Sequence, residues 1–337
     1  MANRKGVSVV ICSYNGSSRI APTLHHIARQ EVQPNLAWEV ILIDNNSKDD
    51  TGRKALALWE SEGKNIPFRV VWEAEPGLSF AKMRGLQEAQ FSYLIYVDDD
   101  NSISSNYVQT VHQIFEEWED VAVCGGDGED ALPAHFVPPH WWNTFKADYA
   151  VGKQGTKEGY KINGFIWGAA SGFRVSALRE LYFEVGHQPF LTGRIGNKLT
   201  AGEDAEVCFC LQRLGYRLYY SPKLQFKHHI PIDRINEAYL MKLKKGFGAA
   251  SVILSIYSDL VQGKQPNWEK SYRSCRKTVF QKTWKYLVVY FSPQKRLTVK
   301  ANLIYAQSRL KTLRQFKKNY EPMYYQLKES LNPKYVG

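Results

Sequence analysis

Apolar runs of strand length alternate with amphipathic segments through the first 125 residues. The runs at 7–12 and 38–43 are rich in Val and Ile, and the stretch between them, 18–30, repeats apolar residues at helical spacing. This alternation predicts right-handed βαβ units and a mostly parallel sheet flanked by helices, an α/β fold. Because ligands of such sheets bind at the carboxyl ends of the strands, functional residues are expected there. Further strands are expected at 68–72, 93–97, 121–124 and 217–221, and helices near 49–62, 79–89, 104–118, 176–183 and 203–214.

The middle of the chain changes character after residue 125. Residues 126–161 are rich in Gly, Pro and Trp, which predicts a long loop over the sheet. Beyond residue 230 the pattern is helical, basic and aromatic. We therefore expect a domain at 1–230, divided into halves at 1–125 and 126–230, followed by a helical C-terminal region at 231–337.

The positive charge is concentrated in that C-terminal region. Residues 231–337 hold 21 Lys and Arg against 6 Asp and Glu, whereas residues 1–230 hold 23 against 27. Such a region attracts an anionic partner, for example phospholipid, nucleic acid or an anionic acceptor. The five scattered Cys form no zinc-type pair, and the sequence has neither a signal-peptide layout nor the roughly 20 apolar residues that span a bilayer. We expect reduced thiols and a cytoplasmic protein that can touch a membrane.

Three adjacent carboxylates, Asp98-Asp99-Asp100, follow the buried run at 93–97. Like charges this close repel one another, and a divalent cation removes that cost. Alternate residues of an extended segment point the same way, so Asp98 and Asp100 can face one site. Mg²⁺ or Mn²⁺ prefers such oxygen ligands and keeps positions open for phosphate. The alternative is a solvated acidic turn that caps the next helix.

Polar residues also follow the first two expected strands. Asp44 ends the second, where it can accept a hydrogen bond from a ribose hydroxyl or a base N–H. Ser13-Tyr14-Asn15 ends the first and can place an aromatic ring and backbone amides beside a nucleotide. Either segment can equally be an ordinary strand-to-helix turn.

Two later segments carry further candidates. Glu203 and Asp204 begin a helix, where carboxylates are good caps, but one of them can also serve as a general base. His228 follows another strand, and a neutral imidazole there can complete a metal's ligand set.

Together, these motifs resemble those of the family 2 glycosyltransferases of bacterial polysaccharide and glycan biosynthesis, which have the GT-A fold and invert the anomeric centre. The matching motifs are residues 7–15, 43–51, 76–85 and 97–100, followed by Gly202-Glu203-Asp204 and by Pro222 to His228. The resemblance covers roughly residues 5–230. It implies a GT-A domain whose first half binds the nucleotide and whose second half binds the acceptor.

The resemblance also implies roles for individual residues. Asp204 would be the catalytic base, supported by Glu203, and the divalent metal, Mn²⁺ or Mg²⁺, would be held by Asp100, Asp98 and His228. The nucleotide-sugar donor, with a UDP-sugar favoured, would contact Ser13, Tyr14, Asn15, Asp44, Asn46, Lys82, Asp98 and Asp99.

Two positions depart from the family pattern. Lys82-Met83 replaces the common Arg-Asn, and because Lys lacks the two-pronged guanidinium, contacts of that Arg to base or phosphate are in doubt. Asn101 follows the aspartates where an acidic residue is common.

The acceptor and the C-terminal region are less constrained by the motifs. Indole faces pack well on sugar C–H faces, so Trp141, Trp142 and the segment at Trp167-Gly168 are candidates for the acceptor wall, with ordinary core packing as the alternative. Lys and Arg among apolar residues at helical spacing predict that 231–337 lies on an anionic membrane, the inner face of the cell membrane. A lipid-linked glycan acceptor would explain such a location. The alternative is an appendage that covers the domain or forms a homodimer contact, and we do not expect nucleic acid as the partner.

The sequence disfavours three other classes of protein. A dinucleotide-dependent oxidoreductase would carry Gly-x-Gly-x-x-Gly in the first turn, which here is Ser13-Tyr-Asn-Gly-Ser-Ser18. A nucleotidyltransferase would carry a basic, Gly-rich phosphate loop near the N-terminus. A non-catalytic membrane- or nucleic-acid-binding protein would leave the acidic triplet without a purpose.

Overall fold

The computed structural model describes residues 4–62, 65–191, 201–289 and 292–332. The chain divides into two compact units, each built from three segments. The first comprises 1–131, 150–188 and 215–229, and the second comprises 132–149, 189–214 and 230–337. The C-terminal helices thus share a unit with parts of the expected second half, and the division at residue 230 stays a prediction.

The first unit is organised around a mixed sheet, which within the described residues has the strand order β3-β2-β1-β4-β9-β6-β10-β8. Most of its strands are parallel, as the alternating pattern predicts. The exceptions are β9, which runs antiparallel to its neighbours β4 and β6, and the edge strand β8, which runs antiparallel to β10. The strands are β1 (Arg4–Ser13), β2 (Trp38–Asn45), β3 (Phe68–Glu73), β4 (Phe91–Asp98), β6 (Val121–Gly125), β8 (Gly159–Tyr160), β9 (Ser171–Arg174) and β10 (Arg217–Tyr220).

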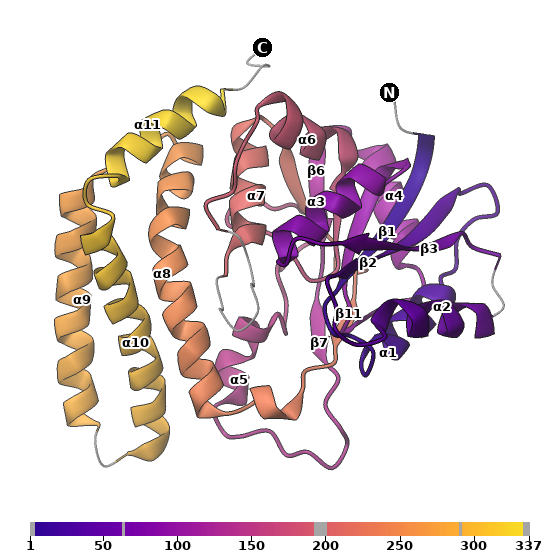
Figure 1. Cartoon of the computed structure of the whole chain (residues 1–337). Helices are drawn as coiled ribbons and strands as arrows, with labels where there is room; N and C mark the ends of the chain where they lie inside the picture. The colour runs from indigo at the N-terminus through magenta and orange to yellow at the C-terminus, as the bar shows by residue number, and fades with distance from the viewer. Residues whose placement is uncertain (1–3, 63–64, 192–200, 290–291, 333–337) are drawn as a thin grey trace. The chain divides into compact units, whose positions relative to one another are not determined.

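Helices cover both faces of this sheet (Figure 1). Val9 and Ile11 of β1 belong to a buried cluster that also contains Leu24 of α1 and Val111 of α4. Val10 points to the other face, where α3 comes so close that a Cβ on Gly85 would lie 2.5 Å from a Val10 methyl carbon. Burial on both faces explains why these strands read as continuous apolar runs. The helices are α1 (Ile20–Ala28), α2 (Thr51–Ser61), α3 (Leu78–Glu88), α4 (Tyr107–Glu117) and α6 (Val175–Arg179), which a π-helical turn, η2 (Glu180–Glu184), extends.

A second, smaller sheet has the order β5-β11-β7, with β5 (Asn101–Ile103), β11 (Phe226–His228) and β7 (Gly128–Asp130). Since β5 directly follows the aspartate triplet, this sheet brings the chain around residue 228 to it. The region 126–161, expected to be a loop, contains β7, β8 and two short helices, α5 (Trp142–Phe145) and η1 (Lys146–Tyr149).

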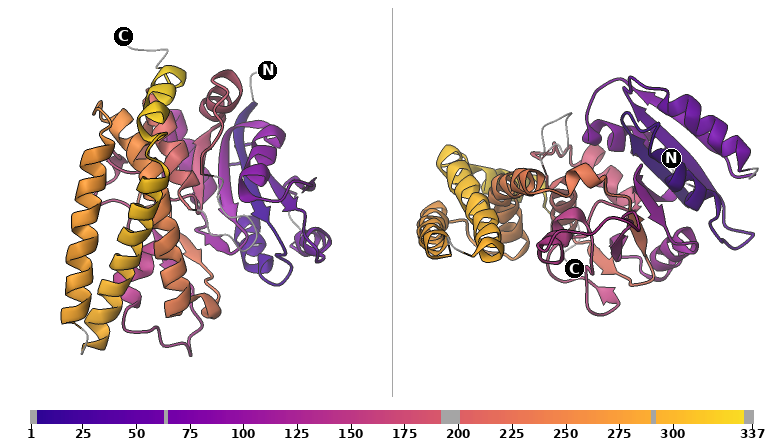
Figure 2. Two further views of the ribbon diagram at one scale, coloured as in Figure 1. Left: turned by 60° about the vertical axis from the view of Figure 1, so that its left-hand side comes forward. Right: turned by 90° about the horizontal axis from the view of Figure 1, so that it is seen from below.

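The second unit is helical in the described residues. Helix α10 packs against both α8 and α9, and α7 and α11 pack on α8 (Figure 2). At Gly248 of α8 an added Cβ would lie 2.3 Å from a backbone oxygen of α10, so the two helices approach closely. The predicted helical nature of the C-terminal region is confirmed. The elements are α7 (Glu203–Arg213), η3 (Ile232–Arg234), α8 (Glu237–Val261), α9 (Trp268–Val288), α10 (Pro293–Gln315) and α11 (Tyr320–Ser330).

Candidate active site

Three neighbouring strands of the large sheet end in polar residues at the same edge. In the register of β1 with β2, Ser13 pairs with Asp44. In the register of β1 with β4, Cys12 pairs with Asp98. The tertiary structure therefore brings together residues from three of the predicted motifs, at the edge where parallel sheets bind ligands.

The turns after β1 and β2 are bonded to each other. Asn15, in the left-handed region with φ 50°, accepts a hydrogen bond from the Lys48 backbone N–H at 2.7 Å through its side-chain oxygen. Its own N–H donates to Ser47 Oγ at 2.9 Å. Asn46, with φ 57°, donates to the backbone oxygen of Ala74 at 2.9 Å. Asn15 and Asn46 thus shape the turns, whereas the Tyr14 side chain is exposed.

Asp44 is buried at the end of β2 and accepts a hydrogen bond from the Ser47 N–H at 3.2 Å. This bond closes the turn that leads into α2. It occupies one carboxylate oxygen and leaves capacity on the other, since an ionised carboxylate has about four acceptor positions.

Asp99 is held by a residue that the sequence did not point to. Arg19 donates to both of its carboxylate oxygens, each at 2.7 Å, and Ser13 Oγ donates to it as well. Arg19 also donates to the backbone oxygens of Tyr14 and Asn15, each at 2.7 Å. One guanidinium therefore ties the acidic triplet to the turn after β1. Burial raises the pKa of Asp99, and the Arg19 hydrogen bond opposes that rise.

Asp98 and Asp100 lie in one electrostatic cluster with His228 and Lys82. The pKa of Asp98 rises to about 6, first because of burial and then because of the Asp100 charge, while Lys82 and His228 oppose the rise. The Asp100 carboxylate lies 3.7 Å from His228 Nε2. Residues 128 positions apart thus meet because β11 pairs with β5 and because the His229 N–H donates to the Asp100 backbone oxygen at 2.8 Å.

This cluster fits a divalent cation as a partial ligand set. Among the described residues, no group of three or more His, Cys, Asp or Glu side chains is arranged to enclose a metal ion. An Asp100 and His228 pair with Asp98 nearby suits a cation that takes its other ligands from phosphate and water. The pKa of Asp98 is raised first by burial and then by the Asp100 charge, and a cation bound beside the two carboxylates would oppose both effects.

The two departures from the family pattern have different surroundings. Lys82 lies with its ammonium 5.7 Å from the centre of the Tyr96 ring and close enough to Asp98 to lower that carboxyl's pKa. It therefore supplies positive charge beside the aspartates. Asn101 is fully buried, so a carboxylate in its place would add a buried negative charge next to the triplet.

Glu203 and Asp204 begin α7 in the second unit, directly after Gly202, which has φ 99°. Both are half-buried, and Asp204 accepts a hydrogen bond from the Ala205 N–H at 2.8 Å. Asp98 and Asp100 belong to the first unit, so the candidate base and the acidic triplet are carried by different units.

Glu206, one turn into α7, has a positioning role that the sequence pattern did not indicate. It is fully buried and accepts hydrogen bonds from the Phe190 and Leu191 N–H groups, at 2.8 and 2.7 Å, and from the Tyr257 hydroxyl at 2.6 Å. It thereby fixes the chain at 190–191 to the helix that carries Asp204. The signal was the third acidic residue in Gly-Glu-Asp-Ala-Glu, which a first-turn cap explains as well.

The candidate acceptor residues divide by burial. Trp141 and Trp142 are each 3% exposed, and Trp142 packs on Tyr149 with ring centres 5.0 Å apart, which favours the packing alternative. Trp167 is half-buried against the core of the first unit, and its backbone N–H donates to the side-chain oxygen of Gln154 at 2.7 Å. Gly168 is also half-buried.

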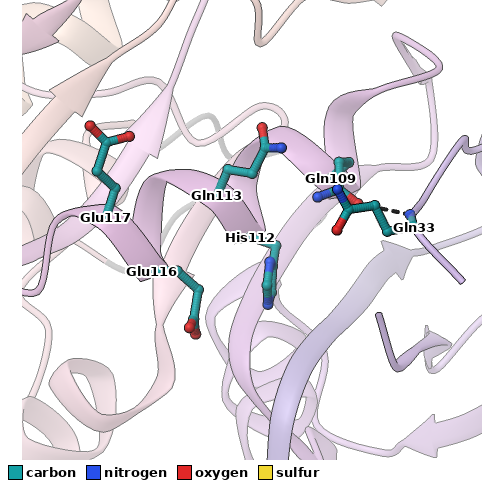
Figure 3. A pocket seen from close by; sticks show the side chains of 6 residues that line it. All are labelled: Gln33, Gln109, His112, Gln113, Glu116 and Glu117. Carbon is teal, nitrogen blue, oxygen red and sulfur yellow. Dashed lines mark hydrogen bonds between the residues drawn. The ribbon is translucent and has the colours of Figure 1, made fainter. Parts of the chain in front are cut away.

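A polar hollow of about 550 Å³ lies elsewhere, on the outer side of α4 (Figure 3). It contains none of the predicted site residues. Its walls are amide, imidazole and carboxylate groups, with the Gln33 N–H donating to Gln109 at 2.9 Å. Its lining is Gln33, Gln109, His112, Gln113, Glu116 and Glu117.

The glycosyl transferase family 2 model matches residues 8–182, slightly more than half of the chain. That range contains the strand ends and the acidic triplet but neither Asp204 nor His228. The fold and this match define the class: the chain belongs to glycosyl transferase family 2, a family of enzymes, and the predicted family is confirmed.

Individual relatives match parts of the chain. Glycosyltransferase GlyG of Streptococcus pneumoniae is 30% identical over 120 residues, which are 35% of this chain and 38% of GlyG. The glucosyl-dolichyl phosphate glucuronosyltransferase of Haloferax volcanii is 22% identical over 235 residues, 66% of this chain and 69% of that protein. The chain thus spans less than half the length of GlyG.

The fold is shared with a solved structure, the mannosyltransferase PcManGT from Pyrobaculum calidifontis in complex with GDP-Man and Mn²⁺. Its TM-score is 0.57 at 16% identity, and the alignment covers 91% of this chain and 87% of that one. The predicted GT-A fold with a helical C-terminal part is confirmed.

Proposed function

We propose that the protein moves a sugar from a nucleotide-diphosphate sugar to a glycan or lipid-linked acceptor, with inversion at the anomeric carbon. The observation that carries this proposal is the cluster at the end of β4, where Asp98 and Asp100 lie beside His228 and Lys82. A cluster that is costly without a cation is suited to binding a diphosphate through one.

The donor nucleotide would bind along the strand ends. The buried Asp44 has acceptor capacity left for a ribose hydroxyl or a base N–H, and the exposed ring of Tyr14 is available to stack on the base. Asn15, Asn46 and Asp99 already hold the turns in place, so their contribution is to position backbone groups around the nucleotide.

The leaving group is a nucleoside diphosphate, on which negative charge grows as the glycosidic bond breaks. A divalent cation bound at Asp100, with Asp98 and His228 in support, would supply charge stabilisation without moving a proton. Lys82 adds a second positive charge near these aspartates, in the role that the family's Arg would otherwise fill.

Asp204 would take the proton of the acceptor hydroxyl while the hydroxyl oxygen attacks the anomeric carbon. Attack on the side opposite the departing diphosphate inverts the configuration of that carbon. Glu203 would support Asp204 or contact the acceptor. Glu206 accepts hydrogen bonds from the backbone at 190–191 and so holds that segment against the helix that carries Asp204. Trp167 and Gly168 remain the candidates for acceptor contact.

We propose the donor and the acceptor by chemical class. PcManGT was solved with GDP-Man and Mn²⁺, which supports a nucleotide sugar and a divalent metal without selecting the nucleotide. A UDP-sugar remains the prediction from the family resemblance. The similar Haloferax protein is a glucosyl-dolichyl phosphate glucuronosyltransferase, which supports a lipid-linked acceptor. No helix among the described residues is long and apolar enough to cross a bilayer. An acceptor of this kind would therefore be met by peripheral contact of residues 231–337 with an anionic membrane.

Two isosteric variants test this assignment. Asp100→Asn should abolish the Mn²⁺-dependent part of nucleoside-diphosphate binding, measured by calorimetry with UDP and GDP. Asp204→Asn should keep that binding and lose turnover by roughly 10²–10⁴-fold, measured as nucleoside diphosphate released from UDP- and GDP-sugars. Asp120→Asn makes the same chemical change at a carboxylate paired with Arg217 on the surface, and should retain both properties.

The results separate the classes of function. Metal-independent binding that Asp100→Asn leaves intact would overturn the cation role. Release of pyrophosphate from a nucleoside triphosphate, in place of nucleoside diphosphate from a nucleotide sugar, would identify a nucleotidyltransferase.

A further inference from the structure

One helix of the second unit keeps large apolar side chains on its surface. In the C-terminal half of α9, Phe280, Trp284, Leu287 and Val288 are 74, 65, 61 and 67% exposed. Their spacing of four, three and one residues places them on one face of the helix. We call these four residues the α9 stripe.

The neighbouring helices bury their apolar residues within the unit. Leu240, Val252 and Ile256 of α8 are fully buried, as are Ala301 and Leu313 of α10. Helix α9 packs on α10, with Cys275 as its buried residue (Figures 1 and 2). Among the described residues beyond 230, the other large apolar side chains at the surface are Ile232 and Tyr325, and neither belongs to α9. The membrane contact predicted for the whole C-terminal region therefore narrows to one face.

The charge of α9 selects the partner. The helix holds six Lys and Arg and a single acidic residue, Glu269, which pairs with Arg273 at 2.9 Å. Arg276 and Lys277 are exposed one turn before Phe280, on the same face, and Lys285 is exposed between Trp284 and Leu287. Cations beside an apolar, Trp-containing stripe match the layered chemistry of an anionic membrane surface.

The same charges disfavour a second copy of the chain. A two-fold symmetric contact would place this face against itself and oppose the cations of one copy to those of the other. Apolar contact between the two copies would then have to overcome the repulsion between their cations. An anionic lipid surface attracts the same cations.

We propose that the α9 stripe, flanked by Arg276, Lys277 and Lys285, docks the protein on an anionic phospholipid bilayer, with the apolar side chains entering the interfacial region. The proposal concerns the location of the protein and does not depend on the transfer chemistry. The helix would lie in the interface, since α9 is too polar to cross it.

The experiment is flotation of the full-length protein with vesicles of phosphatidylcholine alone or mixed with phosphatidylglycerol. We expect binding to the mixed vesicles that is at least 10-fold tighter than to phosphatidylcholine and weakens as salt is raised. The double variant Phe280→Ser/Trp284→Ser should bind at least 10-fold more weakly, and Arg276→Glu/Lys277→Glu should lose the preference for anionic lipid.

The matched control is Val137→Ser/Ile162→Ser, which removes two side chains that are 85 and 80% exposed elsewhere. It should bind vesicles like the parent. Equal binding by the stripe variant and the parent would overturn the proposal. So would a parent that binds no vesicles but forms a dimer that the stripe variant loses. Nucleotide-sugar turnover in lipid-free solution, measured on the same variants, reports separately on the proposed function.

Discussion

The pair of Asp99 and Arg19 offers the sharpest test of how the site is built, because Asp99 admits two roles. It was predicted to contact the donor, yet its carboxylate accepts two hydrogen bonds from Arg19 and one from Ser13. If Asp99 is chiefly a clamp, Asp99→Asn should lower the stability of the protein without any ligand present. If it is chiefly a donor contact, stability should hold and nucleotide affinity should fall.

The magnitude follows from the burial of the pair. Removing one partner of a buried ion pair costs about 3–5 kcal/mol because the other charge is left without compensation. The Asp99 side chain is 9% exposed but that of Arg19 is 31% exposed, so water can partly solvate the remaining charge. We therefore expect Asp99→Asn to lower the unfolding free energy by about 2–3 kcal/mol. For a cooperative unit of about 150–250 residues, the size range of the first unit, that corresponds to a fall in Tm of roughly 4–12 °C.

A double-mutant cycle with Arg19→Met refines the test. Burial raises the pKa of Asp99 despite Arg19, which means that desolvation, together with the Asp100 charge, outweighs the stabilisation of the carboxylate by Arg19. The combined variant should therefore lose much less stability than the two single variants added together. The surface pair of Asp120 and Arg217, with side chains 46 and 57% exposed, is the control, and Asp120→Asn should cost less than about 1 kcal/mol.

The assay is urea unfolding of the ligand-free protein followed by circular dichroism, with nucleotide affinity measured by calorimetry on the same samples. The clamp would be refuted if Asp99→Asn unfolded within about 0.5 kcal/mol of the parent while binding nucleotide at least tenfold more weakly.

Three further changes probe other contacts. Tyr257→Phe removes the buried hydroxyl that donates to Glu206 and should lower the unfolding free energy by about 1.5–3 kcal/mol in urea; an unchanged midpoint would contradict this role. Tyr93 donates to Glu116 at 2.6 Å, and this bond is the largest cause of that carboxyl's lowered pKa. The stability that this bond contributes is present above the ordinary pKa of 4.5 and is lost as the pH falls through the lower pKa of the folded protein. The difference in unfolding free energy between the parent and Tyr93→Phe should therefore shrink between pH 7 and pH 3.5. A difference that grew in acid would contradict the assignment. Gly248→Ala should destabilise the second unit by about 1–3 kcal/mol in thermal unfolding, since the added carbon meets α10; a Tm equal to the parent's would show that the helices can part there.

Local sequence patterns were sufficient to place the strands, the helices and the motifs of the site. Strand and helix positions followed from apolar periodicity, because burial on both sheet faces imposes continuous apolar runs on β1, β2 and β4. Asp44 and Asp98 could be placed at one edge of the sheet from the sequence, because the carboxyl ends of parallel strands lie at the same edge. The family followed from the order of those motifs.

Contacts between residues far apart in the chain could be assigned only once the fold was known. The meeting of Asp100 with His228 requires β11 to pair with β5, and the antiparallel β9 enters between β4 and β6 from a distant segment. The partners of Asp99 and Glu206, which are Arg19 and Tyr257, lie 80 and 51 residues away along the chain. Local patterns record whether a side chain is buried, but the identity of its partner depends on how whole elements pack. For that reason the roles of Glu206, in the first turn of a helix, and of Arg19, at a helix start, could not be predicted from their local sequence.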